Sequence, residues 1–207
     1  MDKQLDILVV EDKEEHQESA RVLLAGHNVE IVGTFDEAAD RICGTSRYAH
    51  KKSSEKKSYA VVLTDMFLPQ GRGDCLADKS QGKIEMPFGY CIALMACKEA
   101  TPYVAIFSWG DHHKNGIAYG MEEFLDGTVQ QVGNSRLAIL GAGNYNIINF
   151  TYKTPDGRIG TLEEVGIKKT DRIMKREYFT EPKGSKFVKN WKAALDYVVS
   201  GKKKQEE

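Results

Sequence analysis

Three acidic residues follow two apolar segments in the first third of the chain. Glu11 and Asp12 come directly after residues 6–10 (DILVV), and Asp65 comes after residues 59–63 (YAVVL) and Thr64. Both segments are too short and too apolar for surface helices, so they predict strands that are buried on both faces. Because the carboxyl ends of parallel strands meet at one edge of a sheet, we expect the three carboxylates to lie together. The alternative is that these acids only begin turns or cap helices.

Carboxylates that lie this close together have raised pKa values unless a cation lies among them. A cluster of oxygen ligands with room for water suits Mg²⁺ better than zinc or copper. Ser108 ends a further apolar segment, residues 103–107 (YVAIF), and adds a hydroxyl at the same edge, although a serine there also serves as a helix cap. A carboxylate beside a hydroxyl and a divalent ion is suited to phosphoryl transfer, with the carboxylate as nucleophile.

The elements that position these groups alternate along the first half of the chain. Strands are predicted at residues 6–10, 29–32, 59–63 and 103–107, and helices at 14–27, 36–46 and 88–98. This order predicts a doubly wound parallel sheet with right-handed crossovers. Strands at 135–140 and 146–152 indicate a small antiparallel excursion, and a fifth strand at 178–180 and a helix at 185–199 close the chain.

Composition limits the class of protein. The 207 residues are 41% hydrophobic and carry a net charge of -1, which allows one good core and argues against nucleic-acid binding as the main function. No segment approaches the roughly 20 apolar residues that span a bilayer, and the charged start MDKQLD is unlike a signal peptide. The four cysteines lack C-x-x-C spacing and are expected to be reduced. These features predict a cytoplasmic protein with no direct nucleic-acid or membrane partner.

Four segments together resemble the receiver domain of bacterial response regulators. They are ILVVED, VVLTDMFLP with Gly73 four residues beyond the proline, VAIFS, and YFTEP before a last amphipathic helix. The resemblance implies a flavodoxin-like, doubly wound five-stranded parallel sheet, with a small β-rich subdomain inserted between strands 4 and 5. Residues 1–207 would then form a single receiver-like domain, with insertions at about 74–86 and at 110–175.

The resemblance also implies roles for the acidic residues. Glu11 and Asp12 would help to hold Mg²⁺, and the backbone carbonyl of Phe67 would complete the protein ligands. Asp65 would be a further metal ligand and would accept a phosphoryl group from a histidine kinase or a phosphotransfer protein. Ser108 would contact the phosphoryl oxygens.

Three positions bear on the signalling output. Tyr178 would be the aromatic switch that turns inward on activation. Receivers carry a lysine immediately before the proline, where this chain has Glu181. A carboxylate there reverses the sign of an interaction worth about 4 kcal/mol at contact in an effective dielectric of about 20. The alternatives are that Lys183 or Lys186 reaches back, or that Glu181 points away or acts as a further metal ligand. Trp109 stands where receivers place a small residue, so its indole would cover the aspartate. Both departures weaken phosphoryl signalling more directly than Mg²⁺ binding.

Two other motifs have simpler interpretations. His112 and His113 follow the fourth predicted strand in a polar loop, where histidines are usually solvated, with a ligand or proton-transfer role as the alternative. The G-x-G at residues 141–143 lacks the third glycine and the helix of a dinucleotide site, which favours a turn.

Three functions remain open at this stage. The first is an atypical stand-alone receiver, a Mg²⁺-dependent phosphoprotein of a two-component system whose phosphoacceptor is Asp65 and which acts through contacts with a protein effector. The second is a pseudo-receiver, an interaction module that keeps the acidic pocket without being phosphorylated. The third is a small Mg²⁺-dependent phosphohydrolase, which lacks the usual D-x-D pair because position 67 is Phe. We prefer the first, whose catalysis would be limited to taking up and losing its own phosphoryl group.

Overall fold

The computed structural model describes residues 4–44, 56–71, 84–108, 127–141, 150–160 and 186–201. Its main sheet has the strand order β2-β1-β3-β6-β8-β7. The strands are β1 (Asp6–Val10), β2 (Asn28–Val32), β3 (Val61–Thr64), β6 (Tyr103–Phe107), β7 (Thr128–Val132) and β8 (Ser135–Leu140). All neighbours from β2 to β8 are parallel, and β7 runs antiparallel to β8 at the edge. This doubly wound order confirms the predicted flavodoxin-like fold.

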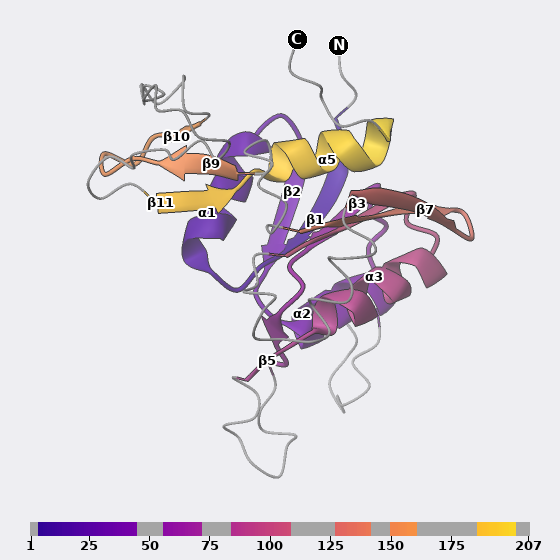
Figure 1. Cartoon of the computed structure of the whole chain (residues 1–207). Helices are drawn as coiled ribbons and strands as arrows, with labels where there is room; N and C mark the ends of the chain where they lie inside the picture. The colour runs from indigo at the N-terminus through magenta and orange to yellow at the C-terminus, as the bar shows by residue number, and fades with distance from the viewer. Residues whose placement is uncertain are drawn as a thin grey trace.

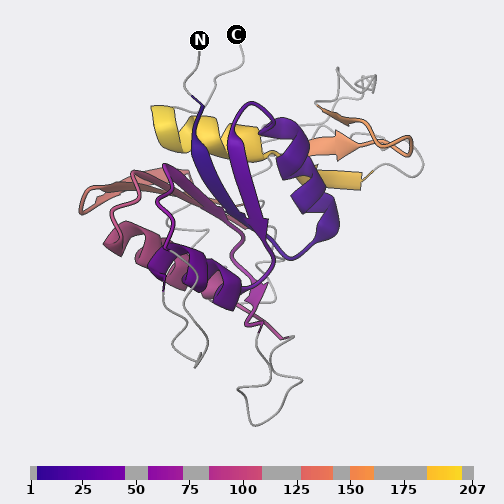
Figure 2. The same ribbon diagram turned by 180° about the vertical axis from the view of Figure 1, so that it is seen from behind.

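Helices cover both faces of this sheet (Figures 1 and 2). They are α1 (Glu14–Leu23), α2 (Phe35–Cys43), α3 (Phe88–Lys98) and α5 (Trp191–Ser200). Alternate residues of β1 point to opposite faces: Ile7 and Val9 belong to the core cluster that contains α1 and α5 side chains, whereas Leu8 and Val10 pack on the α2 and α3 side. The continuous apolar run of β1 is therefore explained by burial on both faces.

Local signals account for the boundaries of α2. The hydroxyl of Thr34 accepts a hydrogen bond from the Glu37 N–H (3.3 Å) and donates one to the Glu37 carboxylate (3.0 Å). This reciprocal cap satisfies a backbone donor at the start of the helix. Gly44 ends the helix with a φ of 68°, a conformation in which a side chain is strained.

The fifth parallel strand is not where the sequence placed it. β8, which was expected in a small antiparallel excursion, pairs in parallel with β6, with Phe107 opposite Leu140. All four residues from Leu137 to Leu140 are buried, as a strand covered on both faces requires. Part of the region 110–175 therefore belongs to the main sheet, and the predicted strand at 178–180 lies outside the described residues. That residues 1–207 form one domain stays a prediction.

A second sheet lies beside α1 (Figures 1 and 2). It has the order β10-β9-β11 and consists of β9 (Phe150–Lys153), β10 (Ile159–Gly160) and β11 (Lys186–Lys189), all antiparallel. The side chain of Lys153 on β9 pairs with that of Glu18 on α1. The sheet thus contacts α1 and has no ladder pairing with the main sheet among the described residues.

The last helix begins later than its apolar spacing predicted. The prediction of a helix over 185–199 was wrong at its start, because residues 186–189 form β11 and α5 begins at Trp191. Asn190 sets this boundary: its side-chain oxygen accepts a hydrogen bond from the Ala193 N–H at 3.0 Å. The strand that precedes the cap delivers Lys189 to the site described below.

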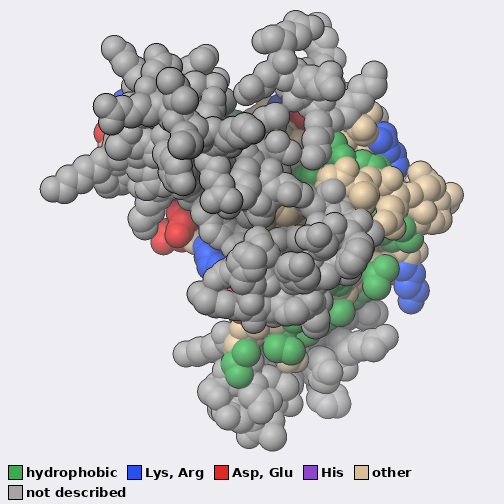
Figure 3. Space-filling view, in the orientation of Figure 1, with side chains coloured by type: hydrophobic (Ala, Val, Ile, Leu, Met, Phe, Trp, Pro, Cys, Tyr) green, Lys and Arg blue, Asp and Glu red, His purple; other side chains and the backbone are tan. Residues whose placement is uncertain are grey.

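The segment after β3 forms a short ribbon. β4 (Leu68–Pro69) pairs antiparallel with β5 (Glu85–Met86), and residues 72–83 between them lie outside the described residues. Hydrophobic side chains are visible between the grey atoms on the face seen in Figure 3. Among the exposed hydrophobic residues are Met86 in β5, at 47%, and Leu94 in α3, at 60%. No helix within the described ranges is long and apolar enough to span a membrane.

Candidate functional site

The parallel pairing of β1 with β3 brings the three predicted acids together. Val10 stands opposite Thr64, so the residues that follow each strand emerge side by side. The Asp65 N–H donates to the Val10 carbonyl at 2.8 Å, which fixes the chain immediately after β3. One carboxylate oxygen from each of Glu11, Asp12 and Asp65 lies within 4.8 Å of the others. This is the juxtaposition that the ends of the two strands predicted.

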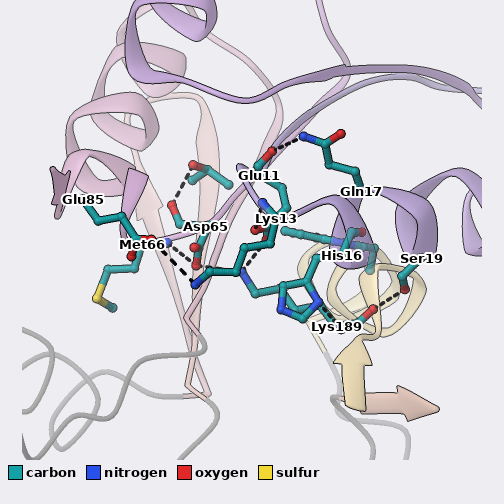
Figure 4. Close-up of polar contacts among 11 residues, drawn as sticks. Glu11, Lys13, His16, Gln17, Ser19, Asp65, Met66, Glu85 and Lys189 are labelled. Carbon is teal, nitrogen blue, oxygen red and sulfur yellow. Dashed lines mark hydrogen bonds and ion pairs between the residues drawn. The ribbon is translucent and has the colours of Figure 1, made fainter. Parts of the chain in front are cut away.

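A buried lysine completes the cluster. The Lys189 ammonium nitrogen lies 2.6 Å from Glu11 Oε2 and 2.7 Å from Asp65 Oδ1. The Lys189 and Glu11 side chains are fully buried, and the Asp65 side chain is 4% exposed. Figure 4 shows the lysine side chain between the two acids. At this burial each charge requires a partner, and the lysine serves both carboxylates.

The two oxygens of Asp65 have different surroundings. Oδ1 accepts a hydrogen bond from the Met66 N–H at 2.8 Å and also pairs with Lys189. Oδ2 has no hydrogen bond or ion pair among the described residues. The carboxylate is therefore held through one oxygen, and the other keeps its lone pairs for a ligand or a reaction.

Glu11 and Asp12 differ from each other in whether their carboxylate oxygens have hydrogen-bond partners. Glu11 Oε1 accepts from the Lys13 N–H at 3.1 Å, and Oε2 accepts from Lys189, so both oxygens have partners. Asp12 Oδ1 is buried without a hydrogen-bond partner in the part of the chain that the structure describes. A buried, unpartnered carboxylate oxygen is costly, and a cation at this point would satisfy it.

Burial and charge set the ionisation of the cluster. Burial raises the pKa values of Glu11 and Asp65, and the nearby Lys189 opposes that rise. Burial also raises the pKa of Asp12, and the negative charge of Glu85 adds to the effect. Burial alone would lower the pKa of Lys189, but the charges of Asp65 and Glu11 outweigh it and raise that pKa. The lysine is therefore charged at neutral pH.

A fourth acid approaches from the β4–β5 ribbon. Glu85 lies in β5, 44% exposed, and its Oε1 is 4.0 Å from the ammonium of Lys13. Figure 4 shows it on the side of the site opposite α1. Sequence reasoning missed Glu85, because residues 70–86, which are rich in glycine and charge, indicated an irregular segment rather than a strand.

Gly89 permits the close approach of α3 to the site. Its N–H donates to the Met66 carbonyl at 3.0 Å. A Cβ at position 89 would lie 2.1 Å from the backbone oxygen of Asp65 and 2.8 Å from the Met66 Cα. Because these are backbone atoms, a side chain at this position would displace the turn that carries Asp65.

Two further predicted residues lie within the described part of the chain. Ser108 follows β6, is fully buried, and donates its N–H to the Leu140 carbonyl at 2.9 Å. The pairing of β3 with β6 places it at the same edge of the sheet as Asp65. Phe67 follows Asp65 by two residues in the turn before β4, and its side chain packs against the core on the α2 and α3 side. Its carbonyl as a metal ligand stays a prediction.

The remaining predicted residues lie outside the described residues. They are Trp109, His112, His113, Tyr178 and Glu181. Their suggested roles therefore stay predictions.

Sequence reasoning also missed Lys189, whose ammonium lies beside Asp65. The signal for it was a lysine at the end of a short apolar segment (FVK), directly before an asparagine that caps the last helix. It was missed because the segment YFTEP, residues 178–182, carries the proline by which the resemblance located this position. Lys189 supplies a positive charge beside Asp65. The effect expected of Glu181 stays a prediction, because that residue lies outside the described residues.

No family model and no curated protein matches the sequence. The structure resembles response regulators. The bacteriophytochrome response regulator AtBRR has 18% sequence identity and a TM-score of 0.38, covering 69% of this chain and 84% of its own. The Mn²⁺-bound form of response regulator Rcp1 has 15% identity and a TM-score of 0.39, covering 68% of this chain and 82% of its own.

Proposed function

We propose that this protein is a receiver-type phosphoacceptor whose Asp65 takes a phosphoryl group in the presence of Mg²⁺. The observation that carries the proposal is the pairing of Asp65 with Lys189 beside the unpartnered oxygen of Asp12. Such a site brings together a nucleophile, a fixed positive charge and a carboxylate oxygen that is available to bind a cation. The donor is a histidine kinase or a phosphotransfer protein, and the output passes through contacts with a protein effector.

In the proposed reaction, Asp65 Oδ2 is the nucleophile. Its lone pair attacks the phosphorus of the donor, an O–P bond forms, and the bond from phosphorus to the donor breaks with its electron pair leaving on the donor. The hydrogen bonds to Oδ1 hold the carboxylate plane while this occurs. Because Oδ1 is anchored through the Met66 N–H and Lys189, the nucleophile is oriented before the donor arrives.

Lys189 neutralises negative charge at the site. Its ammonium already lies against Asp65 and Glu11, and a phosphoryl group on Asp65 would add further oxygens for it to bind. Since the amine is fully buried, its attraction for those oxygens is screened less than it would be in water.

The residues present fit a divalent cation. Asp12 Oδ1 and Asp65 Oδ2 are the oxygens without protein partners among the described residues, so these two carboxylates are better placed than Glu11 to hold the ion directly. Mg²⁺ bound there would offset the charge of the transferring phosphoryl group. Glu11 contributes by holding Lys189, because both of its oxygens are already engaged.

The burial of Asp65 favours a second candidate function. The residue is only 3% exposed and is already paired with an ammonium group, which limits the approach of a phosphodonor. A pseudo-receiver that is never phosphorylated and acts as an interaction module would keep this arrangement. Mg²⁺ binding alone does not separate the two functions, so the experiment must detect the covalent product.

The test is intact mass spectrometry after incubation with acetyl phosphate and Mg²⁺. We expect one added phosphoryl group on the wild type, and none on Asp65→Asn or without metal. Asp156→Asn, which changes a carboxylate with a 61% exposed side chain, is the control and is expected to behave as the wild type. Absence of an adduct while calorimetry detects Mg²⁺ binding would establish the pseudo-receiver instead.

A further inference from the structure

The site is assembled from two different sheets. The acids follow strands of the main sheet, whereas Lys189 is the last residue of β11 in the small sheet beside α1. No ladder pairing connects these sheets among the described residues. Some other contact must therefore set how far the lysine reaches into the site, since buried charges need close placement.

That contact is made by two polar side chains on α1. Ser19 donates from its hydroxyl to the Lys189 carbonyl at 2.6 Å, and His16 Nδ1 accepts a long hydrogen bond of 3.4 Å from the Lys189 N–H. The two α1 residues are three positions apart, hence on one face of the helix, and both are buried. Figure 4 shows both beside the lysine backbone.

These two bonds replace a neighbouring strand. β11 is an edge strand that pairs with β9 on one side, where Lys189 stands opposite Phe150. In an antiparallel ladder a residue makes both backbone bonds to its partner or turns both to the other side. Lys189 turns its N–H and C=O to α1, where His16 and Ser19 satisfy them. Two side chains of α1 thus bind the free edge of β11 at one defined residue, Lys189.

Trp191 strengthens the same contact. Its indole N–H donates to the His16 carbonyl at 2.9 Å, and its ring centroid lies 5.2 Å from the Lys189 ammonium. Burial, followed by the positive charges of Lys189 and Lys13, lowers the pKa of His16 to about 3, so the imidazole is neutral and Nδ1 can accept. The backbone of Lys189 and the side chain of Trp191 are therefore both bonded to one turn of α1.

We propose that His16 and Ser19 are positioning residues that hold the backbone of Lys189 on α1, so that its ammonium reaches the acids. α1 begins directly after Glu11 and Asp12, which makes this helix the element that relates the lysine to the carboxylates. A slip of one residue along this edge would turn the side chain of Lys189 away from the site. This inference rests on the proposed function where it concerns phosphoryl transfer, but the placement of Lys189 is measurable independently.

The test compares Ser19→Ala with a conservative variant of the same residue and with a control variant elsewhere. Ser19→Thr keeps the hydroxyl, and Ser135→Ala removes another buried serine hydroxyl, which donates to a backbone carbonyl, that of Cys97, at 3.5 Å. We expect Ser19→Ala to slow phosphoryl uptake from acetyl phosphate about tenfold. Ser19→Thr and Ser135→Ala are expected to stay close to the wild-type rate.

A double-mutant cycle separates positioning from general stability. In a Lys189→Arg background, which keeps a counter-charge for Glu11 and Asp65 but changes the side chain that is positioned, Ser19→Ala is expected to slow the rate much less than in the wild type, because its action passes through the lysine. An equal loss in both backgrounds would overturn the proposal. If Ser19→Ala does not fold, His16→Leu removes the acceptor for the Lys189 N–H and carries the same expectations.

A second readout does not depend on phosphorylation. Reductive methylation with formaldehyde, followed by peptide mass spectrometry, should leave the buried Lys189 unmodified in the wild type and in Ser135→Ala. Ser19→Ala should make it reactive, and unchanged protection would overturn the positioning role. If the wild type takes up no phosphoryl group, the proposed function fails, and this labelling alone decides the role of Ser19.

Discussion

Lys189 Nζ lies 2.7 Å from Asp65 Oδ1, although the lysine comes from the small sheet and the aspartate follows a central strand of the main sheet. The same nitrogen lies 2.6 Å from Glu11 Oε2. One ammonium group thus offsets two carboxylates in a space from which water is largely excluded. This relationship links the stability of the fold to the chemistry of the site.

Replacing Lys189 should destabilise the protein strongly. Lys189→Met leaves Glu11 and Asp65 buried without their counter-charge, and breaking a buried ion pair by removing one partner lowers stability by roughly 3–5 kcal/mol. The measurement is the free energy of unfolding in urea at pH 7 without metal. Lys192→Met is the control: it breaks an exposed pair with Asp196 one helical turn away and should change stability by less than about 0.5 kcal/mol. Equal losses in both variants would contradict the buried triad.

Asp12→Asn should weaken Mg²⁺ binding while leaving the metal-free protein at least as stable. The substitution removes a charge from an oxygen that has no hydrogen-bond partner among the described residues. We expect calorimetry to give a loss in Mg²⁺ affinity of about tenfold or more, because a hard cation loses an ionised ligand. Glu14→Gln, an exposed acid in the first turn of α1, should bind as the wild type does. An unchanged affinity in Asp12→Asn would remove Asp12 from the metal site.

Gly89→Ala should damage both stability and the site. The added Cβ would meet the backbone oxygen of Asp65 at 2.1 Å, and relieving such a clash costs about 1–3 kcal/mol. Thermal unfolding and phosphoryl uptake should both decline, because the displaced turn carries the proposed nucleophile. At Gly26 a Cβ would meet nothing within 4 Å, so Gly26→Ala should be tolerated. Wild-type uptake in Gly89→Ala would show that the turn can shift without consequence.

Glu30 should contribute to the pH dependence of stability. Burial disfavours its charged form, but hydrogen bonds from Lys57, Arg41 and Tyr59 outweigh this and lower its pKa from 4.5 to about 2. A carboxyl whose pKa is lower in the folded state stabilises the protein above pH 4.5 and loses that contribution as the pH falls towards 2.

The comparison that isolates this effect is Glu30→Gln against the wild type. The variant should be less stable at pH 7, and the difference between the two free energies of unfolding should shrink as the pH falls below 4.5. Parallel pH curves for the two proteins would show that Glu30 has no lowered pKa in the folded state.

Short-range signals were sufficient for much of the fold. The apolar runs of β1, β3 and β6 specified buried strands, and alternation with helices specified the doubly wound order. Thr34 marked the start of α2 because a cap depends on neighbours within one turn, whereas the helix ends at Cys43 and not at residue 46 as predicted. The identity of the fifth strand was not accessible in this way. Residues 135–140 and 178–180 were both predicted to be strands, and only pairing with β6 shows that β8 is the one next to it in the main sheet.

For the site, the sequence by itself determined that Glu11, Asp12 and Asp65 meet, because acids that follow adjacent parallel strands emerge at the same edge. Only the tertiary structure decided which lysine joins them. A lysine at the end of a strand carries the same local signal whether it is solvated or buried. Lys189 is selected because β11 docks on α1, and that docking depends on residues distant in sequence, including His16 and Ser19. Contacts between residues so distant in sequence leave no periodic pattern in the chain. They can therefore be identified only from the packed structure, in which both sheets contact α1.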